Sequence, residues 1–154
     1  LGGDRRAQRG GGRHLTSTGR PVPVPDTRSQ PFWDAAAEHQ LVLARCTGCD
    51  KLCHPPDAAC PHCGSTDPDF SFVAVDGSGV IRSWTVIRQS FLQGFDVPFV
   101  LVDVELAVQA DLRLIGRLVD GPETPLSLGA PVHLAFEDVA PGVAVPAFAL
   151  GATA

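Results

Sequence analysis

Apolar and polar residues alternate along most of the chain after residue 70. In PFVLVDVEL (98–106), the apolar residues Val100, Val102 and Val104 are separated by Leu101 and Asp103. This two-residue period predicts a strand with one buried face. Comparable patterns, separated by short turns with Gly or Pro, cover 70–89 (with a turn at 76–79), 111–120, 129–139 and 145–150. Five or six such strands with almost no helical stretch indicate a small closed barrel.

The first part of the chain is patterned differently. Residues 1–29 are rich in Gly, Arg and Pro without periodicity, which predicts a disordered linker. In SQPFWDAAAEHQ, Pro31 fits a first helical turn and three alanines follow, so we expect a short helix. LVLARC (41–46) then predicts a strand that leads into a cysteine-rich segment. The expected organisation is a linker over 1–29, a helix with a cysteine-rich module over 30–69, and the barrel over 70–150.

The net charge of −5 is unevenly distributed. Residues 1–30 carry six arginines against two aspartates, whereas residues 31–154 carry six basic and fifteen acidic side chains. An acidic folded region argues against a partner that is recognised through a phosphate backbone. The apolar runs are too short for a signal peptide or a membrane span, so we expect a soluble, cytoplasmic protein.

All five cysteines lie within one short segment. Cys46-x2-Cys49 and Cys60-x2-Cys63 form two identical knuckles separated by ten residues. Two such turns facing each other can place four thiolates around one zinc ion, at about 2.3 Å per Zn–S bond. Four thiolates leave no open position for water, so this spacing predicts a structural Zn²⁺ site and not a hydrolytic one.

Other interpretations of the cysteines are weaker. Disulfides are disfavoured because the number of cysteines is odd and the expected compartment is reducing. Iron in a rubredoxin-like site uses the same four thiolates, so the sequence leaves the choice of metal open. Cys53 is the fifth cysteine, and we expect a buried, inert side chain instead of a reactive thiol activated by its neighbour His54.

Two groups of apolar residues are candidate contacts for a partner protein or an acyl chain. In the loop RQSFLQGFDVP (88–98), Phe91, Leu92 and Phe95 lack the spacing of a strand. Phe32 and Trp33 on the expected helix either cover the core or dock onto a partner.

The sequence offers little for catalysis. His133 lies on an expected strand, and Asp103 and Glu105 share one face of another, where carboxylates more often form a solvated surface. No nucleophile motif and no Gly-rich phosphate loop after a strand is present. We therefore expect no catalysis by this chain alone.

The cysteine module followed by barrel strands resembles the DUF35 family. CTGCDKLCHPPDAACPHCGS, GSGVIRSWTVI, PFVLVDVEL, LRLIGRLVD, LGAPVHLAFEDV and VPAFAL occur in the order seen in that family and span roughly residues 30–150. The resemblance implies a mainly β fold, in which an N-terminal helix and a rubredoxin-like zinc ribbon precede a five-stranded OB-fold barrel. The family often has Gly where this chain has Asp50, and Arg where this chain has Asp57.

The resemblance also implies an accessory function. DUF35 proteins are commonly partners of thiolase-superfamily enzymes that act on acyl-CoA. Some are fused behind an enoyl-CoA hydratase-like domain of steroid side-chain degradation and join a thiolase-like aldolase that performs a retro-aldol cleavage. The chain, which has no Met, suits a tail excised from such a fusion. We expect a non-catalytic domain in a hetero-oligomer with an aldolase or acyltransferase, with acyl-CoA as a further contact at the shared site.

An OB-fold and zinc-ribbon protein that binds nucleic acid is the alternative. Arg82, Arg88, Arg113 and Arg117 could form a basic stripe for a nucleic acid, or for the phosphates of CoA. A single-strand surface needs stacking aromatic residues in a basic groove. The acidic balance and the absence of Tyr favour the accessory function, in which Arg82 and Arg88 are candidate contacts.

Overall fold

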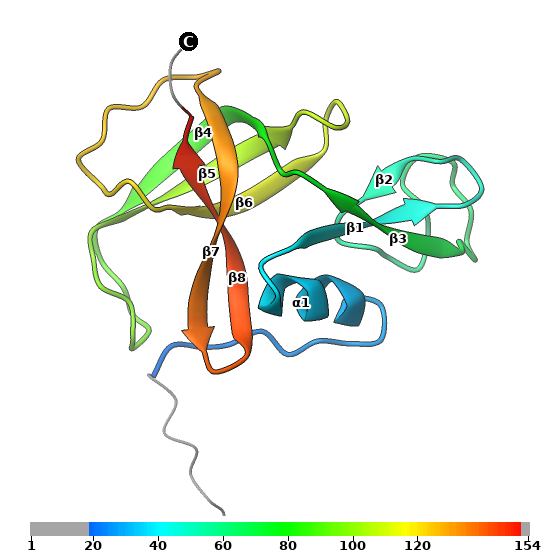
Figure 1. Ribbon diagram of the computed structural model, residues 1–154, viewed down its shortest axis with the longest axis horizontal. Helices are drawn as coiled ribbons and strands as arrows, with labels where there is room; N and C mark the ends of the chain where they lie inside the picture. Colours follow the sequence, from blue (N-terminus) through cyan, green and yellow to red (C-terminus); the bar gives the residue numbers. More distant parts are fainter. Residues whose placement is uncertain (1–18, 152–154) are drawn as a thin grey trace, which may run out of the picture.

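The computed structural model describes residues 19–151 and contains two β modules joined by one helix (Figure 1). One module is a three-stranded sheet in the order β2-β1-β3, and the other is a closed barrel in the order β4-β5-β6-β8-β7. The mainly β fold with one short helix, a ribbon sheet and a five-stranded barrel is confirmed.

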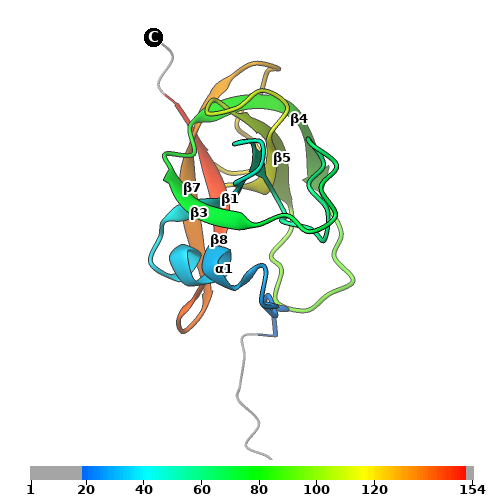
Figure 2. The same ribbon diagram turned by 90° about the vertical axis from the view of Figure 1, so that its right-hand side faces the viewer.

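Helix α1 (Gln30–Ala37) begins after Ser29, with Pro31 in its first turn as expected. A reciprocal pair of hydrogen bonds precedes it: the Ser29 amide donates to Asp26 Oδ1 at 2.8 Å, and the Asp26 amide donates to Ser29 Oγ at 3.0 Å. The helix buries Phe32 and packs against β1 and β8, so it bridges the two modules (Figures 1 and 2).

The ribbon sheet is built around β1 (Leu41–Cys46). Strand β1 pairs in antiparallel orientation with β2 (Leu52–Cys53) and with β3 (Phe70–Val75). Strand β3 therefore completes the ribbon sheet. From its alternating sequence we expected it to belong to the barrel, within residues 70–150. The barrel strands begin after the turn at 76–78.

The barrel consists of β4 (Gly79–Ile87), β5 (Phe99–Leu106), β6 (Arg113–Leu118), β7 (Pro131–Ala140) and β8 (Val143–Leu150). All pairs are antiparallel except β6 with β8, and β4 closes the barrel against β7. Strand β4 lies very close to β5 at its first residue: a Cβ added at Gly79 would lie 2.6 Å from Val104 Cγ1. Glycine is the residue that permits this approach.

One apolar core serves both modules. Leu41, Leu43 and Leu52 of the ribbon pack in the same cluster as Val102 and Phe148 of the barrel. Among the described residues, no polar or charged side chain is buried in this core. Ribbon and barrel are therefore held together by shared apolar burial. Within residues 19–151, no helix is long and apolar enough to cross a bilayer.

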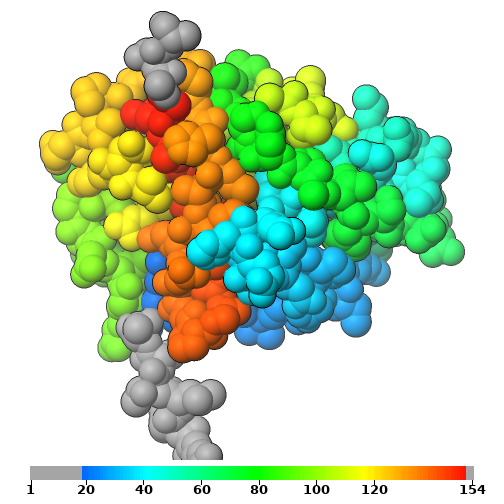
Figure 3. All heavy atoms as spheres, viewed as in Figure 1, coloured from blue at the N-terminus to red at the C-terminus, as the bar shows by residue number. Residues whose placement is uncertain are grey.

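Residues 19–29, here called the strap, run past the end of the β7–β8 hairpin and along α1 before they turn into the helix (Figure 1). Arg20, at the start of the strap, contacts both the loop 88–98 and β7, so the strap begins between the loop and the β7–β8 hairpin (Figure 3). The range 1–29, which we predicted as a linker, thus includes a stretch packed on the barrel. Residues 1–18 lie outside the described residues.

Candidate metal centre and apolar groove

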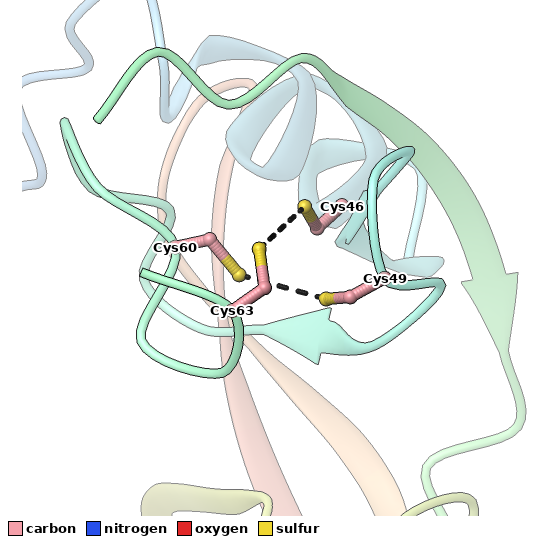
Figure 4. A group of neighbouring side chains, drawn as sticks. All are labelled: Cys46, Cys49, Cys60 and Cys63. Carbon is pink, nitrogen blue, oxygen red and sulfur yellow. Dashed lines mark hydrogen bonds between the residues drawn. The ribbon is translucent and has the colours of Figure 1, made fainter. Parts of the chain in front are cut away.

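The four knuckle cysteines converge on one point (Figure 4). Their sulfur atoms all lie within 4.8 Å of one another, with Cys46 Sγ 4.0 Å from Cys63 Sγ and Cys49 Sγ 3.7 Å from Cys60 Sγ. A tetrahedron of sulfurs around zinc has edges of about 3.8 Å when each Zn–S bond is about 2.3 Å. The donor set and its spacing therefore fit a metal ion held by four thiolates.

Both knuckles have the same backbone hydrogen bonds. The amide of the residue after the second cysteine donates to the carbonyl of the first, from Asp50 to Cys46 at 2.8 Å and from Gly64 to Cys60 at 2.9 Å. This turn needs a positive φ at its last residue, which is 60° at Asp50 and 73° at Gly64. A left-handed backbone favours glycine, so Asp50 occupies a position where glycine would carry less strain.

The remaining thiol differs from the other four. Cys53 is buried, and burial raises the pKa of its thiol to about 11, which keeps it protonated at neutral pH. By contrast, hydrogen bonds from the backbone amides of Cys63 and His62 lower the pKa of the Cys60 thiol, which favours its thiolate form. Cys53 is buried as expected, and its raised pKa disfavours the thiolate form that a reactive cysteine needs.

A side-chain amide ties the ribbon to the barrel. Gln109, in the turn between β5 and β6, accepts a hydrogen bond from the Leu52 amide at 2.9 Å and donates one to the Leu52 carbonyl at 3.0 Å. The same carbonyl accepts a hydrogen bond from His62 Nε2 at 3.0 Å. Gln109 thus pairs with the free edge of β2 as a neighbouring strand would. No local sequence signal indicates this link, because the two residues are far apart in the chain.

An apolar groove of about 430 Å³ lies on the outer face of the barrel. The loop 88–98 forms one wall, and the apolar lining includes Trp33, Ile87, Leu92, Phe95, Leu101 and Ile115. At the tip of the loop, Phe91 is 92% exposed and Leu92 is 59% exposed. An exposed apolar surface of this kind is typical of an interaction site.

Five side chains in this groove form a closed series of contacts, which we call the groove circuit. The Arg20 guanidinium lies over the Phe95 ring at 4.7 Å, and Phe95 stacks on Phe99 at 5.9 Å. Arg117 lies over Phe99 at 5.3 Å and donates to Glu137 at 3.0 Å. Glu137 also accepts a hydrogen bond from Arg20 at 3.4 Å, which closes the circuit.

The predicted contact residues occupy different environments. Leu92, Phe95 and Trp33 line the groove, and Phe91 is exposed beside it. Phe32, in contrast, is only 4% exposed and belongs to the core, so its position argues against a role as a surface contact.

The basic stripe expected from the sequence is largely neutralised. Arg82 pairs with Glu105 at 2.9 Å and Arg113 pairs with Asp103 at 2.6 Å, while Arg88 is exposed. The hydrogen bond from Arg82 lowers the pKa of the Glu105 carboxyl, which makes it a weak base. These strand carboxylates are therefore engaged in ion pairs.

Comparison with known proteins agrees with this architecture. Residues 33–69 match the ChsH2 rubredoxin-like zinc ribbon domain, and residues 72–137 match the ChsH2 C-terminal OB-fold domain. A solved chain described as "Ltp2-ChsH2(DUF35) aldolase" superposes with a TM-score of 0.72 at 32% identity, covering 83% of this chain and 98% of that chain. A DUF35 protein of unknown function from Sulfolobus solfataricus has the same fold, with a TM-score of 0.51 at 16% identity over 70% of this chain and 77% of that one.

Two curated relatives are longer than this chain. A probable enoyl-CoA hydratase alpha subunit of Thermomonospora curvata is 36% identical over 84% of this chain. The 3-oxo-4,17-pregnadiene-20-carboxyl-CoA hydratase alpha subunit of Mycobacterium tuberculosis is 30% identical over 70% of it. The chain spans only 39% and 33% of these two relatives. Together, the two domain matches and the solved chain show that this protein belongs to the ChsH2 (DUF35) family.

Proposed function

We propose that this chain is a non-catalytic accessory domain that binds and supports a thiolase-like aldolase acting on acyl-CoA. The observation that carries the proposal is the similarity to the ChsH2 chain of an Ltp2-ChsH2 aldolase, of which this chain covers 98%. The name of the Mycobacterium tuberculosis relative, a pregnadiene carboxyl-CoA hydratase subunit, supports a steroid side chain as the substrate class. The reaction would then be the retro-aldol cleavage that follows hydration of that side chain.

We assign the carbon–carbon cleavage to the aldolase subunit. The ion pairs of Asp103 and Glu105 with arginines support this assignment, because a paired carboxylate of lowered pKa abstracts protons poorly. His133 lies on β7 and is exposed to solvent. Neither arrangement provides a nucleophile next to a base.

The metal centre has a structural role in this proposal. Cys46, Cys49, Cys60 and Cys63 would hold Zn²⁺ with all four positions filled, and the ion would fix the two knuckles relative to β1. Zinc in such a site contributes to folding and supplies no reactive water.

The apolar groove and the loop 88–98 are the surface that we assign to the aldolase subunit. The loop exposes Phe91, an aromatic residue of the kind enriched at protein interfaces, and Leu92 extends its apolar surface. Arg82 and Arg88 remain candidate contacts with the aldolase or with CoA phosphates. The pairing of Arg82, Arg113 and Arg117 with carboxylates disfavours a nucleic-acid partner, because little unpaired positive charge is left on this face.

A binding experiment with an aldolase subunit tests the proposal. The subunit is the Ltp2 relative from the same organism, here called the cognate Ltp2-type subunit. We expect a stable complex in analytical ultracentrifugation, and a Phe91→Ala/Leu92→Ala double variant should bind at least tenfold more weakly while keeping its metal content. A Val24→Ala variant, which removes an exposed apolar side chain from the strap, is the matched control. The proposal is wrong if the native chain and its cognate subunit sediment separately at micromolar concentration.

A further inference from the structure

The loop 88–98 has little structure of its own. No helix or strand lies between Ile87 and Phe99. Its internal hydrogen bonds join only Ser90 and Leu92: the Ser90 hydroxyl donates to the Leu92 carbonyl at 3.0 Å, and the Leu92 amide lies 3.2 Å from Ser90 Oγ. A loop with an exposed apolar tip and so few internal bonds must be held in place by contacts from outside.

The strap provides such contacts through Arg20. A Cβ at Gly94 would lie 2.5 Å from the Arg20 nitrogen, so the two backbones meet where only glycine fits, with φ of 80° at Gly94. Beside this contact, the Arg20 guanidinium covers the Phe95 ring at 4.7 Å and bonds to Glu137 at 3.4 Å. Backbone approach, ring contact and ion pair therefore converge on one residue of the strap.

Arg20 also completes the groove circuit. The loop contributes Phe95, and three barrel strands contribute Phe99, Arg117 and Glu137. Arg20 is the one member that comes from neither the barrel strands nor the loop. Without it, Phe95 keeps its stacking contact with Phe99 but loses the guanidinium over its ring, and its remaining path to Glu137 runs through Phe99 and Arg117.

We propose that Arg20 is a positioning residue that holds the loop 88–98 in the conformation that presents Phe91 and Leu92 to the aldolase subunit. The inference rests on the proposed function, because the aldolase is the partner assigned to this surface. A loop ordered before binding has less conformational entropy to lose on association, so it binds more tightly for the same contacts. Arg20 lines the groove itself, and by ordering the loop it would add to affinity beyond any contact of its own with the partner.

The test measures loop order and partner binding separately, in the metal-loaded full chain. Backbone ¹⁵N relaxation should give residues 91–96 order parameters near those of the barrel in the native chain, and values below about 0.6 in Arg20→Ala. Affinity for the cognate Ltp2-type subunit should fall about tenfold, as expected for losing a cation–π contact and a partly buried ion pair. Arg20→Lys should recover only part of both effects, because it lacks the planar guanidinium. Arg28→Ala, on the same strap and exposed, is the matched control.

The outcomes separate this inference from the proposed function. Unchanged loop order parameters in Arg20→Ala overturn it, whatever happens to binding. Increased loop motion with unchanged affinity also overturns it, because the loop order would then have no consequence for docking. Failure of the Phe91→Ala/Leu92→Ala variant to weaken binding counts against the docking surface of the proposed function, while the relaxation data still report whether Arg20 holds the loop.

Discussion

Replacing Gln109 with alanine removes a side chain that bonds to both the amide and the carbonyl of Leu52 on the free edge of β2. The Leu52 amide then loses its hydrogen bond of 2.9 Å, and the Leu52 carbonyl keeps only the bond from His62. Each hydrogen bond contributes about 0.5–1.5 kcal/mol net, so losing two destabilises the fold by about 1–3 kcal/mol. For a domain of this size, this corresponds to a fall in Tm of about 3–10 °C.

Thermal unfolding of the metal-saturated chain, followed by circular dichroism, measures this effect. Gln109→Glu distinguishes pairing from packing, because it keeps an acceptor for the Leu52 amide but places a carboxylate against the Leu52 carbonyl. It should therefore be no more stable than Gln109→Ala. Gln89→Ala, at an exposed position, is the control and should leave Tm unchanged. A Tm of Gln109→Ala within 1 °C of the control would refute this account of the link.

Three further predictions concern the ribbon and the barrel. Asp50→Gly should stabilise the chain by about 0.5–1 kcal/mol, because it relieves a positive φ and loses only an exposed ion pair with Arg45. A lower midpoint of denaturant unfolding than that of the native chain would contradict this. Gly79→Ala should destabilise by about 1–3 kcal/mol or more, since its Cβ would overlap the Glu105 carbonyl and Val104; a native-like Tm would show that β4 and β5 can separate. Burial lowers the pKa of His54 below 6.5 in the folded chain, so the unfolded chain binds the proton more readily. The free energy of unfolding should therefore fall as the pH drops from 6.5 towards the pKa of His54 in the folded chain. Urea unfolding at several pH values should show a shallower pH dependence in this window for His54→Gln, and an equal slope would exclude His54 as a cause.

The elements that the sequence predicts well are those with a local signal. The period of two in β5 and the two CxxC knuckles need no information about distant residues, and both are found where expected. The turn that gives Asp50 its positive φ is local as well, because its hydrogen bond runs from the Asp50 amide to the Cys46 carbonyl four residues earlier.

Features that depend on distant pairing could not be predicted in the same way. Strand β3 has the alternation of a barrel strand, but its partner is β1, because the ribbon offers a free edge in register from Leu41 to Cys46. Phe32 and Trp33 are adjacent in sequence, yet about 100° apart around a helix, so one enters the core while the other reaches the groove. The circuit through Arg20 joins residues more than a hundred positions apart.

Cleavage of an acyl-CoA aldol substrate by the cognate Ltp2-type subunit, titrated with this chain, tests the central claim most directly. Cleavage should rise with added chain and saturate at a fixed molar ratio, while the chain alone should release no product. Cleavage that is indifferent to the chain, or substantial turnover by the chain on its own, would contradict it.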